Sequence, residues 1–548
     1  MGVFNRVKSW TALTILALSL LASSVPASVS AAGPIACGDS LHSSVVLGAD
    51  IAGCTNGLVI SNNGMTLDCA SHAISGVGGG VGVNVTGRAG VVIRNCFISG
   101  FNDGILLNKT SSSTVAGNHL TSNAYGVLVI GGSSNALKSN LASGNGYDFF
   151  LRKAAKNLLV GNSATGGGGY HLVGSRLNIV RGNLATNTQS GFRLLNSSLN
   201  AVSNNLATGG SFSGFLLAGS STLNTLKNNT ASGNSWNGFE VRSGQNKLLK
   251  NVATGNARNG FLLSGPRESA LANLATGNAL AGFYLSSSNR DTLTKNTARS
   301  NYDGFRLADS SKAMLVGNVA DSNSFSGFSL IGGSLNLLSR NSGTDNYGPD
   351  FYLLTSFQNR VSQNTAGGSS GEGFYLVNSS RNSLLGNVVP GTAFGGYGFL
   401  VISGSQNTLN GNSAANSLNG FSLRSTSGNT LRKNTAGNNL FYGYLLDASS
   451  SNELRSNSAN DNTNGFYIIS GTANTFRSNF ANGNTNDGFH LNHSATSNLV
   501  ATNVSGSNSW FGISDASIGT GTSGTANTYV GNTCSSNGAG GSNPSGVC

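Results

Sequence analysis

Acidic residues are scarce in this chain, and six of the 19 recur at one place in a repeated motif. When the repeats are aligned on Gly-Phe-x-Leu, these six lie directly before the glycine or replace it: Asp103, Asp148, Asp303, Asp350, Glu372 and Asp487. Carboxylates about 5 Å apart can share a cation or separate their pKa values. Asp303, Asp350 and Glu372 are therefore candidate acids, bases or Ca²⁺ ligands, with Arg306 as a charge stabiliser.

A turn offers a second interpretation of the same position. Other repeats carry Asn237, Asn259, Ser326 and Asn419 there. Asp, Asn and Ser interchange in solvated turns, because their short polar side chains bond to the nearby backbone. Under this interpretation the acids are solvated turn residues and form no site.

A second candidate site lies inside the motif, at the position between Phe and Leu, which points outward from a strand. Over five successive repeats this position holds Tyr284, Arg306, Ser329, Tyr352 and Tyr375. Tyrosine rings can stack on sugar rings while polar neighbours bond to hydroxyls, so Tyr284, Arg306, Tyr352 and Tyr375 are candidate carbohydrate-binding residues. A purely structural interpretation also stands, because tyrosine suits an exposed strand and other repeats place leucine here, as at Leu216, Leu262 and Leu445.

The elements that must position these side chains come from one repeat of 21 to 25 residues that begins at an asparagine. Each repeat holds three short runs with period-2 alternation, separated by Ser, Asn and Gly, and no window shows the periodicity of a helix. Three short strands per repeat predict a parallel β-helix of about 20 coils, a rod about 95 Å long. The helical segment and the dense leucine spacing of a leucine-rich repeat are missing.

Within this rod, the Phe and Leu of the motif should point inward and stack on their equivalents in neighbouring coils. Three columns of asparagine should line the corners, because asparagine tolerates the left-handed conformation and its amide can bond the equivalent amide one coil away. We predict an N-terminal cap with the first coils over residues 33–94, regular coils over 95–502, and a C-terminal coil and cap over 503–548.

The N-terminus has the pattern of a signal peptide over residues 1–32. Arg6 and Lys8 precede a short apolar run, and small residues follow it. We therefore expect a secreted or cell-surface protein, periplasmic if the source has an outer membrane, with no membrane span. Six cysteines near the two ends then predict the disulfides Cys37–Cys54, Cys69–Cys96 and Cys534–Cys548.

The stretch "CGDSLHSSVVLGADIAGCTNGLVISNNGMTLDCASHAISG", together with the coil repeat, resembles bacterial right-handed β-helix proteins of the NosD-like and carbohydrate-binding or sugar-hydrolase type. The resemblance implies an all-β, single-stranded right-handed parallel β-helix with disulfide-linked terminal caps. It leaves the activity open, because this architecture carries lyases, hydrolases, epimerases, adhesins and non-catalytic proteins.

The motifs of polygalacturonases and alginate epimerases with this fold are missing from the sequence, whereas the diffuse motif of pectate lyases cannot be tested by a string search. Asn-Thr-Asp, Asp-Asp, Gly-His-Gly and Asp-Pro-His-Glu do not occur, and the one Arg-x-Lys lies in the signal peptide. The copper association of NosD-like proteins would need clustered His, Met or Cys. The one close histidine pair, His490 and His493, is better interpreted as two solvated residues, so no metal site is predicted.

These observations predict an exported rod that binds polysaccharide or acts as an adhesive or structural protein, with a polysaccharide or cell-surface partner. A formal charge of +12, spread singly along the chain, gives no basic stripe for nucleic acid. The alternative is a polysaccharide lyase, epimerase or hydrolase, and a copper-linked role comes third. No cofactor is expected, except Ca²⁺ under the enzyme interpretation.

Overall fold

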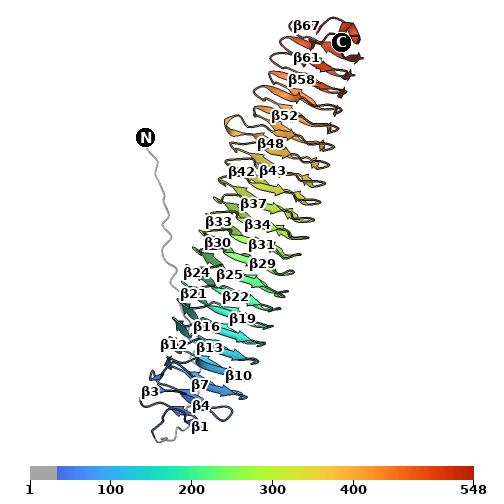
Figure 1. Cartoon of the computed structure of the whole chain (residues 1–548). Coiled ribbons are helices and arrows are strands. Elements are labelled where there is room, and N and C mark those ends of the chain that lie inside the picture. The colour runs from blue at the N-terminus through green and yellow to red at the C-terminus, as the bar shows by residue number, and fades with distance from the viewer. Residues whose placement is uncertain (1–33) are drawn as a thin grey trace, which may run out of the picture.

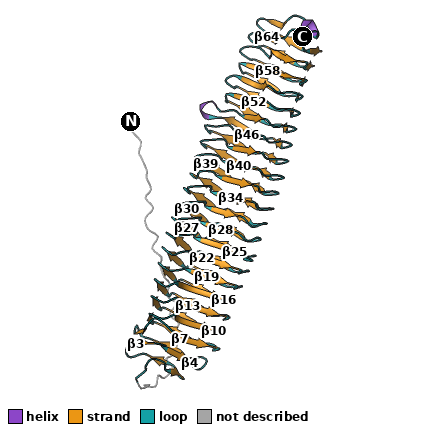
Figure 2. Ribbon diagram, in the orientation of Figure 1, coloured by secondary structure: helices purple, strands orange, loops and turns teal. Residues whose placement is uncertain are grey.

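The computed structural model describes residues 34–548, so the expected signal peptide lies outside the described residues. Strands β1 to β67 and two short 3₁₀ turns wind into one continuous rod (Figures 1 and 2). The first coils lie at one end, in blue, and the last coils at the other, in red (Figure 1). The 3₁₀ turns are η1 (Ala393–Gly395) and η2 (Thr522–Gly524).

Each coil contributes one strand to each of three parallel sheets, which we call A, B and C. In a central coil, β34 (Phe283–Ser286) lies in sheet A, β35 (Thr292–Thr294) in sheet B and β36 (Thr297–Arg299) in sheet C. Sheet A holds 23 strands, from β1 (Ser40–Leu41) to β67 (Gly540–Asn543). Sheets B and C hold 22 each, ending at β65 (Thr528–Val530) and β66 (Thr533–Ser535), which confirms the predicted three-stranded coil.

The core of the rod contains a continuous stack of aromatic rings from sheet A. From Phe149 to Phe489, successive rings lie 4.5 to 4.9 Å apart and 3° to 9° from parallel, with Tyr170 and Tyr444 in the same row. Alanines of sheet C and leucines of sheet B fill the remaining interior. A single coil could not bury its own ring on both faces, so the stack exists because the coils repeat.

Three asparagine ladders line the corners, as predicted. In the ladder between sheets B and C, the Asn296 backbone N–H and Nδ2 both donate to Asn318 Oδ1, at 2.9 and 3.0 Å, and Nδ2 also donates to the Ala270 carbonyl at 3.0 Å. This pattern repeats from Asn118 to Asn532. Each buried amide thereby satisfies backbone groups of the corner that the sheets leave unpaired.

The left-handed residue at this corner is the one before each ladder asparagine, and not the asparagine itself as we expected. Ala272, Lys295 and Arg340 occupy it with φ of 55°, 52° and 55°. Their side chains point away from the ladder into solvent, whereas the asparagine needs an extended backbone to aim its amide along the rod. Many residue types therefore appear at the left-handed position.

At the N-terminal end, both predicted disulfides are present. Cys37 bonds to Cys54, and Cys69 bonds to Cys96. Cys96 occupies the first position of the corner ladder, since its N–H donates to Asn118 Oδ1 at 3.1 Å. Asn95, at which we began the first repeat, is the left-handed residue before it, with φ of 57°.

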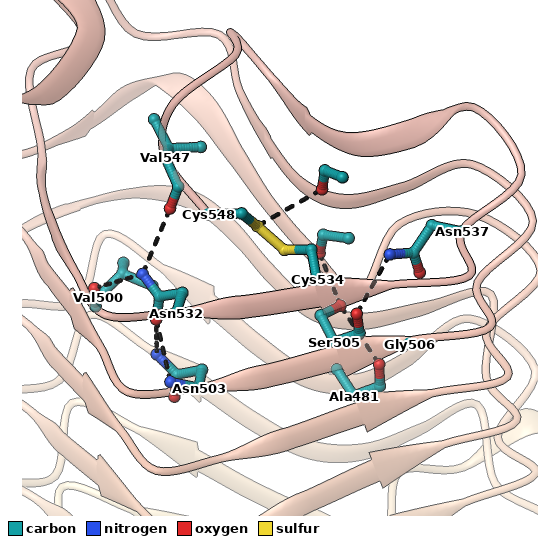
Figure 3. Close-up of a disulfide and its surroundings, with 12 residues drawn as sticks. Ala481, Val500, Asn503, Ser505, Gly506, Asn532, Cys534, Asn537, Val547 and Cys548 are labelled. Carbon is teal, nitrogen blue, oxygen red and sulfur yellow. Dashed lines mark hydrogen bonds between the residues drawn. A yellow bond between two sulfur atoms is a disulfide. The ribbon is translucent and has the colours of Figure 1, made fainter.

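At the C-terminal end, the last coil is closed by the third predicted disulfide, Cys534–Cys548 (Figure 3). The chain folds back so that the Val547 carbonyl accepts a hydrogen bond from Asn532 Nδ2, the last rung of the ladder. The final asparagine amide therefore has a partner although no further coil follows it. Within residues 34–548, no helix has the length and apolarity needed to cross a membrane.

Candidate functional site on the outer face of sheet A

The outward residues of sheet A form one row along the rod, which we call the floor row. The strands that carry its central part are β22 (Phe192–Leu195), β25 (Phe215–Ala218), β28 (Phe239–Val241), β31 (Phe261–Leu263), β34, β37 (Phe305–Ala308), β40 (Phe328–Ile331), β43 (Phe351–Leu354) and β46 (Phe374–Val377). Strand register places their outward residues directly beside one another: Arg193, Leu216, Glu240, Leu262, Tyr284, Arg306, Ser329, Tyr352 and Tyr375.

The floor row is recessed. We expected an exposed line of tyrosines, but Tyr284, Tyr352 and Tyr375 are only half-exposed and Ser329 is buried. A second row of side chains flanks the floor row from Arg193 to Ser329. The sequence prediction of the row was therefore correct in register and wrong in exposure.

This second row, which we call the overhang, comes from the turn that leads from sheet C into sheet A. Its members lie two residues before the motif glycine in seven successive coils: Gln189, Phe212, Trp236, Arg258, Leu280, Tyr302 and Phe325. Most are joined coil to coil by backbone hydrogen bonds, as from the Tyr302 N–H to the Leu280 carbonyl at 2.9 Å and from the Phe325 N–H to the Tyr302 carbonyl at 2.7 Å. Sequence reasoning missed this row, although its fixed offset from the motif would have revealed it.

Between the floor row and the overhang lies a recess of about 280 Å³, which we call the Trp236 pocket. Phe212 and Trp236 form its aromatic wall, with ring centroids 5.4 Å apart at 66°. The Arg258 guanidinium lies 4.2 Å above the Trp236 ring. This contact holds the indole in place by a cation–π interaction.

A buried carboxylate lies at the base of this pocket. Glu240 is 2% exposed, and its oxygens accept hydrogen bonds from Ser213 Oγ at 2.5 Å, Asn237 Nδ2 at 3.2 Å and Arg242 Nε at 2.7 Å. Arg242 Nη2 also lies 2.5 Å from Glu240 Oε1. The carboxylate charge is thus compensated within the protein, which leaves Glu240 as a fixed part of the pocket base.

Arg193 lies at the N-terminal end of the same pocket, and His171 precedes it in the floor row. Arg193 lines the recess, and its buried Nε has no hydrogen-bond partner among residues 34–548. His171, its neighbour in the floor row, is 3% exposed and its Nε2 likewise has no partner in the described chain. Burial and, second, the Arg193 charge lower the pKa of His171 to about 4, so His171 is neutral near pH 7.

The predicted tyrosine segment lies on the same face, toward the C-terminus. Arg306 joins two of the predicted residues, because its guanidinium lies 5.7 Å from the Tyr284 ring centroid and 3.6 Å from Asp303 Oδ2. Tyr352 and Tyr375 lie 5.4 Å apart. Phe325 of the overhang meets Tyr352 edge-on at 6.3 Å, so this segment is also walled by aromatic rings.

The candidate acids are not solvated turn residues, and that interpretation is wrong for most of them. Asp303 is 2% exposed, Asp350 is fully buried and Glu372 is half-buried. Burial raises the pKa of all three, that of Asp350 to about 7. Asp303 accepts hydrogen bonds from Ser326 Oγ at 2.6 Å and lies beside Arg306. Glu372 lies close enough to Tyr352 and Tyr375 for its charge to raise their pKa values, after burial.

Asp350 lies apart from the other candidates, inside the coil. Its Oδ1 accepts hydrogen bonds from Asn346 Nδ2 at 2.7 Å and Ser369 Oγ at 2.5 Å. Ser369 stands where the next ladder asparagine would be, so Asp350 supplies the acceptor that the ladder lacks. Gly343 replaces the usual alanine of sheet C and leaves room for it, because a Cβ there would lie 2.9 Å from Asp350 Cβ. Asp148 fills a second interrupted rung in the same way, accepting from Asn145 Nδ2.

Several solved structures match part of this chain at low sequence identity. The A-module of the mannuronan C-5 epimerase AlgE6 of Azotobacter vinelandii is 16% identical over 59% of this chain and 89% of its own, with a TM-score of 0.36. The periplasmic alginate epimerase AlgG is 10% identical over 68% and 78%, with a TM-score of 0.25. DFA-IIIase of Arthrobacter chlorophenolicus A6 without its lid is 11% identical over 49% and 67%, with a TM-score of 0.26. No curated protein matches the chain in sequence.

Two family models match the sequence. The family described as "Periplasmic copper-binding protein (NosD)" matches residues 163–265, 224–316 and 249–417. The family described as "Right handed beta helix region" matches residues 40–185 and 391–505. The two models thus cover adjoining stretches of the same continuous rod.

The described residues do not fit a copper site. All six cysteines are in disulfides, and residues 34–548 contain no group of three or more His, Cys, Asp or Glu side chains that could hold a metal. His490 Nδ1 bonds to Asp487 Oδ2 at 2.8 Å and its ring stacks on Tyr467, whereas His493 is exposed further along the same strand, β61 (Phe489–Thr496). The soft or imidazole donors that copper prefers are therefore not gathered here.

The matched family models and the observed coil indicate the same architecture. The coil has three parallel sheets, an aromatic stack and asparagine ladders, and the matched models extend from residue 40 to residue 505. The chain is therefore a right-handed parallel β-helix repeat protein, and its central part, residues 163–417, is similar to NosD.

Proposed function

We propose that the protein binds polysaccharide along the outer face of sheet A and works outside the cytoplasm. The observation that carries this proposal is the recessed floor row, in which the half-exposed Tyr352 and Tyr375 pack together beside Phe325 of the overhang. Aromatic faces with adjacent polar groups suit sugar rings, and a polymer can follow the row from coil to coil. Three disulfides support an oxidising location.

The test is a polysaccharide array with purified protein, with and without Ca²⁺, scored for retention and for release of reducing or unsaturated ends. Tyr352→Ala should weaken retention about tenfold, because it removes one stacking face. Phe480→Ala is the matched control, since it removes an exposed aromatic ring from the outer face of sheet C. Equal retention by the Tyr352→Ala variant and the wild-type protein would remove the floor row as the binding surface.

The same array examines the enzyme alternative. Glu372 is the predicted acid that remains half-exposed beside Tyr352 and Tyr375. Release of polymer ends that disappears in Glu372→Gln would replace binding by catalysis as the function. Retention without release supports binding.

A further inference from the structure

The Trp236 pocket holds a positive charge that no acid of residues 34–548 neutralises. Of the arginines that line it, Arg242 is paired with Glu240, whereas Arg193 forms no ion pair in the described chain. Leu216 separates Arg193 from Glu240 in the floor row, about two strand spacings or 10 Å along the rod.

Two neighbouring side chains of the floor row each keep a buried nitrogen without a partner. The Nε of Arg193 and the Nε2 of His171 have no hydrogen-bond partner in the described residues, and His171 is 3% exposed. Buried polar atoms normally have partners. An incoming group with several acceptor oxygens would satisfy the guanidinium at this end of the recess.

We propose that the Trp236 pocket binds one anionic sugar residue, with its carboxylate or sulfate group on Arg193 and its ring against Trp236 and Phe212. The guanidinium fork matches the two oxygens of such a group, and the aromatic wall offers a face for the ring. A recess of about 280 Å³ is small for a ligand pocket and suits a single ring. This inference rests on the proposed glycan binding and adds the charge of the sugar and its place on the rod.

A cationic ligand is disfavoured by the same contacts. Both oxygens of Glu240 are already occupied by Ser213, Asn237 and Arg242. Arg258, exposed above Trp236, adds further positive charge at the mouth of the pocket. The field at the recess therefore attracts an anion.

The experiment compares two oligosaccharides of equal length by calorimetry: a hexamer of galacturonic acid, and the same hexamer with its carboxylates reduced to hydroxymethyl groups. The wild-type protein should bind the acidic hexamer at least about tenfold more tightly. Arg193→Gln should lose about tenfold to a hundredfold in affinity for the acidic hexamer, as expected for a charge-assisted hydrogen bond, with little effect on the reduced one. A sulfated galactose hexamer distinguishes the two anionic groups.

Arg181→Gln is the matched control, because Arg181 is an exposed arginine on the outer face of sheet B, close to Arg193 in sequence. It removes the same charge from the protein and should leave both affinities unchanged. Trp236→Ala should weaken both hexamers, since it removes the stacking face. A thermal melt of each variant confirms that it folds.

The outcomes separate this inference from the proposed function. Equal affinity for the acidic and reduced hexamers, or equal losses in Arg193→Gln and Arg181→Gln, would overturn the anionic pocket. Retention of neutral polymers that depends on Tyr352 would still support glycan binding in that case. If no glycan of either charge binds, both proposals are wrong.

Discussion

Glu268 and Asp291 are two buried carboxyl groups in successive coils. They replace asparagines in the ladder that lines the corner between sheets A and B. Asn246 donates its N–H to Glu268 Oε2 at 3.0 Å, and the Glu268 N–H donates to Asp291 Oδ1 at 2.7 Å. Both side chains are at most 1% exposed. Burial is the main cause that raises the pKa of Glu268 to about 9 and that of Asp291 to about 6.

These pKa values make folding stability depend on pH. Both carboxyls hold their protons more tightly in the folded chain than in the unfolded chain, so their contribution is complete below about pH 4 and is lost as pH rises toward 9. Glu268→Gln with Asp291→Asn should remove this loss and raise the free energy of unfolding at pH 9 by at least about 2 kcal/mol. Urea unfolding at pH 5, 7 and 9 measures the difference.

Glu453→Gln is the control for that experiment, because Glu453 is an exposed acid on the outer face of sheet B. It should change stability little at any of the three pH values. A Glu268→Gln/Asp291→Asn variant whose stability falls with pH as steeply as that of the wild-type protein would show that the two carboxyls are not the titrating groups.

At the scale of the element, the aromatic stack links each coil to its two neighbours only. Phe283 lies 4.7 Å from Phe261 and 4.8 Å from Phe305, and all three rings are fully buried. In such a one-dimensional array, stability is close to a sum of coil and neighbour terms. Removing one ring should therefore destabilise only its own coil and the two neighbouring coils.

Phe283→Ala should cost about 3 to 5 kcal/mol, because it removes a large buried side chain and leaves a cavity between two rings. Hydrogen exchange followed by mass spectrometry should show faster exchange in β31, β34 and β37 and unchanged exchange near both ends of the rod. Phe283→Leu keeps most of the volume and should show a smaller effect at the same strands. Faster exchange spread evenly over residues 34–548 would contradict a local array.

The strands and their register could be predicted from the sequence because each coil repeats the same residue types at the same positions. The inward Phe and Leu, the three ladders and the register of Tyr284 with Arg306 all follow from period and motif. The burial of Asp350 could not be predicted, since it depends on Ser369 and Gly343, each a departure from the consensus in a different segment of the coil. The overhang was missed because its members occupy the same position in each coil but differ in chemical type.

At the scale of the whole molecule, each end of the rod presents three sheet edges with unpaired backbone groups. At the C-terminal end, residues 544–548 follow the last strand, β67, and fold back against the final coil, to which Cys534–Cys548 joins them. This cover lets Asn532 complete its ladder within the molecule. Protection of this sheet edge therefore depends on a small part of the chain.

Replacing Cys534 and Cys548 by serine should loosen this cover. We expect a loss of about 2 to 4 kcal/mol in the stability of the last coil and slow association through the exposed sheet edges. Light scattering over time at fixed concentration measures the association. Replacing Cys37 and Cys54 by serine is the companion variant at the other end, and a Cys534→Ser/Cys548→Ser protein that stays monodisperse would show that the fold-back alone covers the edge.

The uniform ladders and the continuous aromatic stack also fix the distances between surface features along the rod. Strand spacing is fixed at about 4.8 Å. The distance between the Trp236 pocket and the Tyr352–Tyr375 pair is therefore the number of coils between them multiplied by this spacing. Glu240 and Tyr352 are five strands apart in sheet A. Gaining or losing one whole coil between them would keep the same kind of contact between neighbouring coils and change only this distance, so the spacing of the two places can vary without a change in the core.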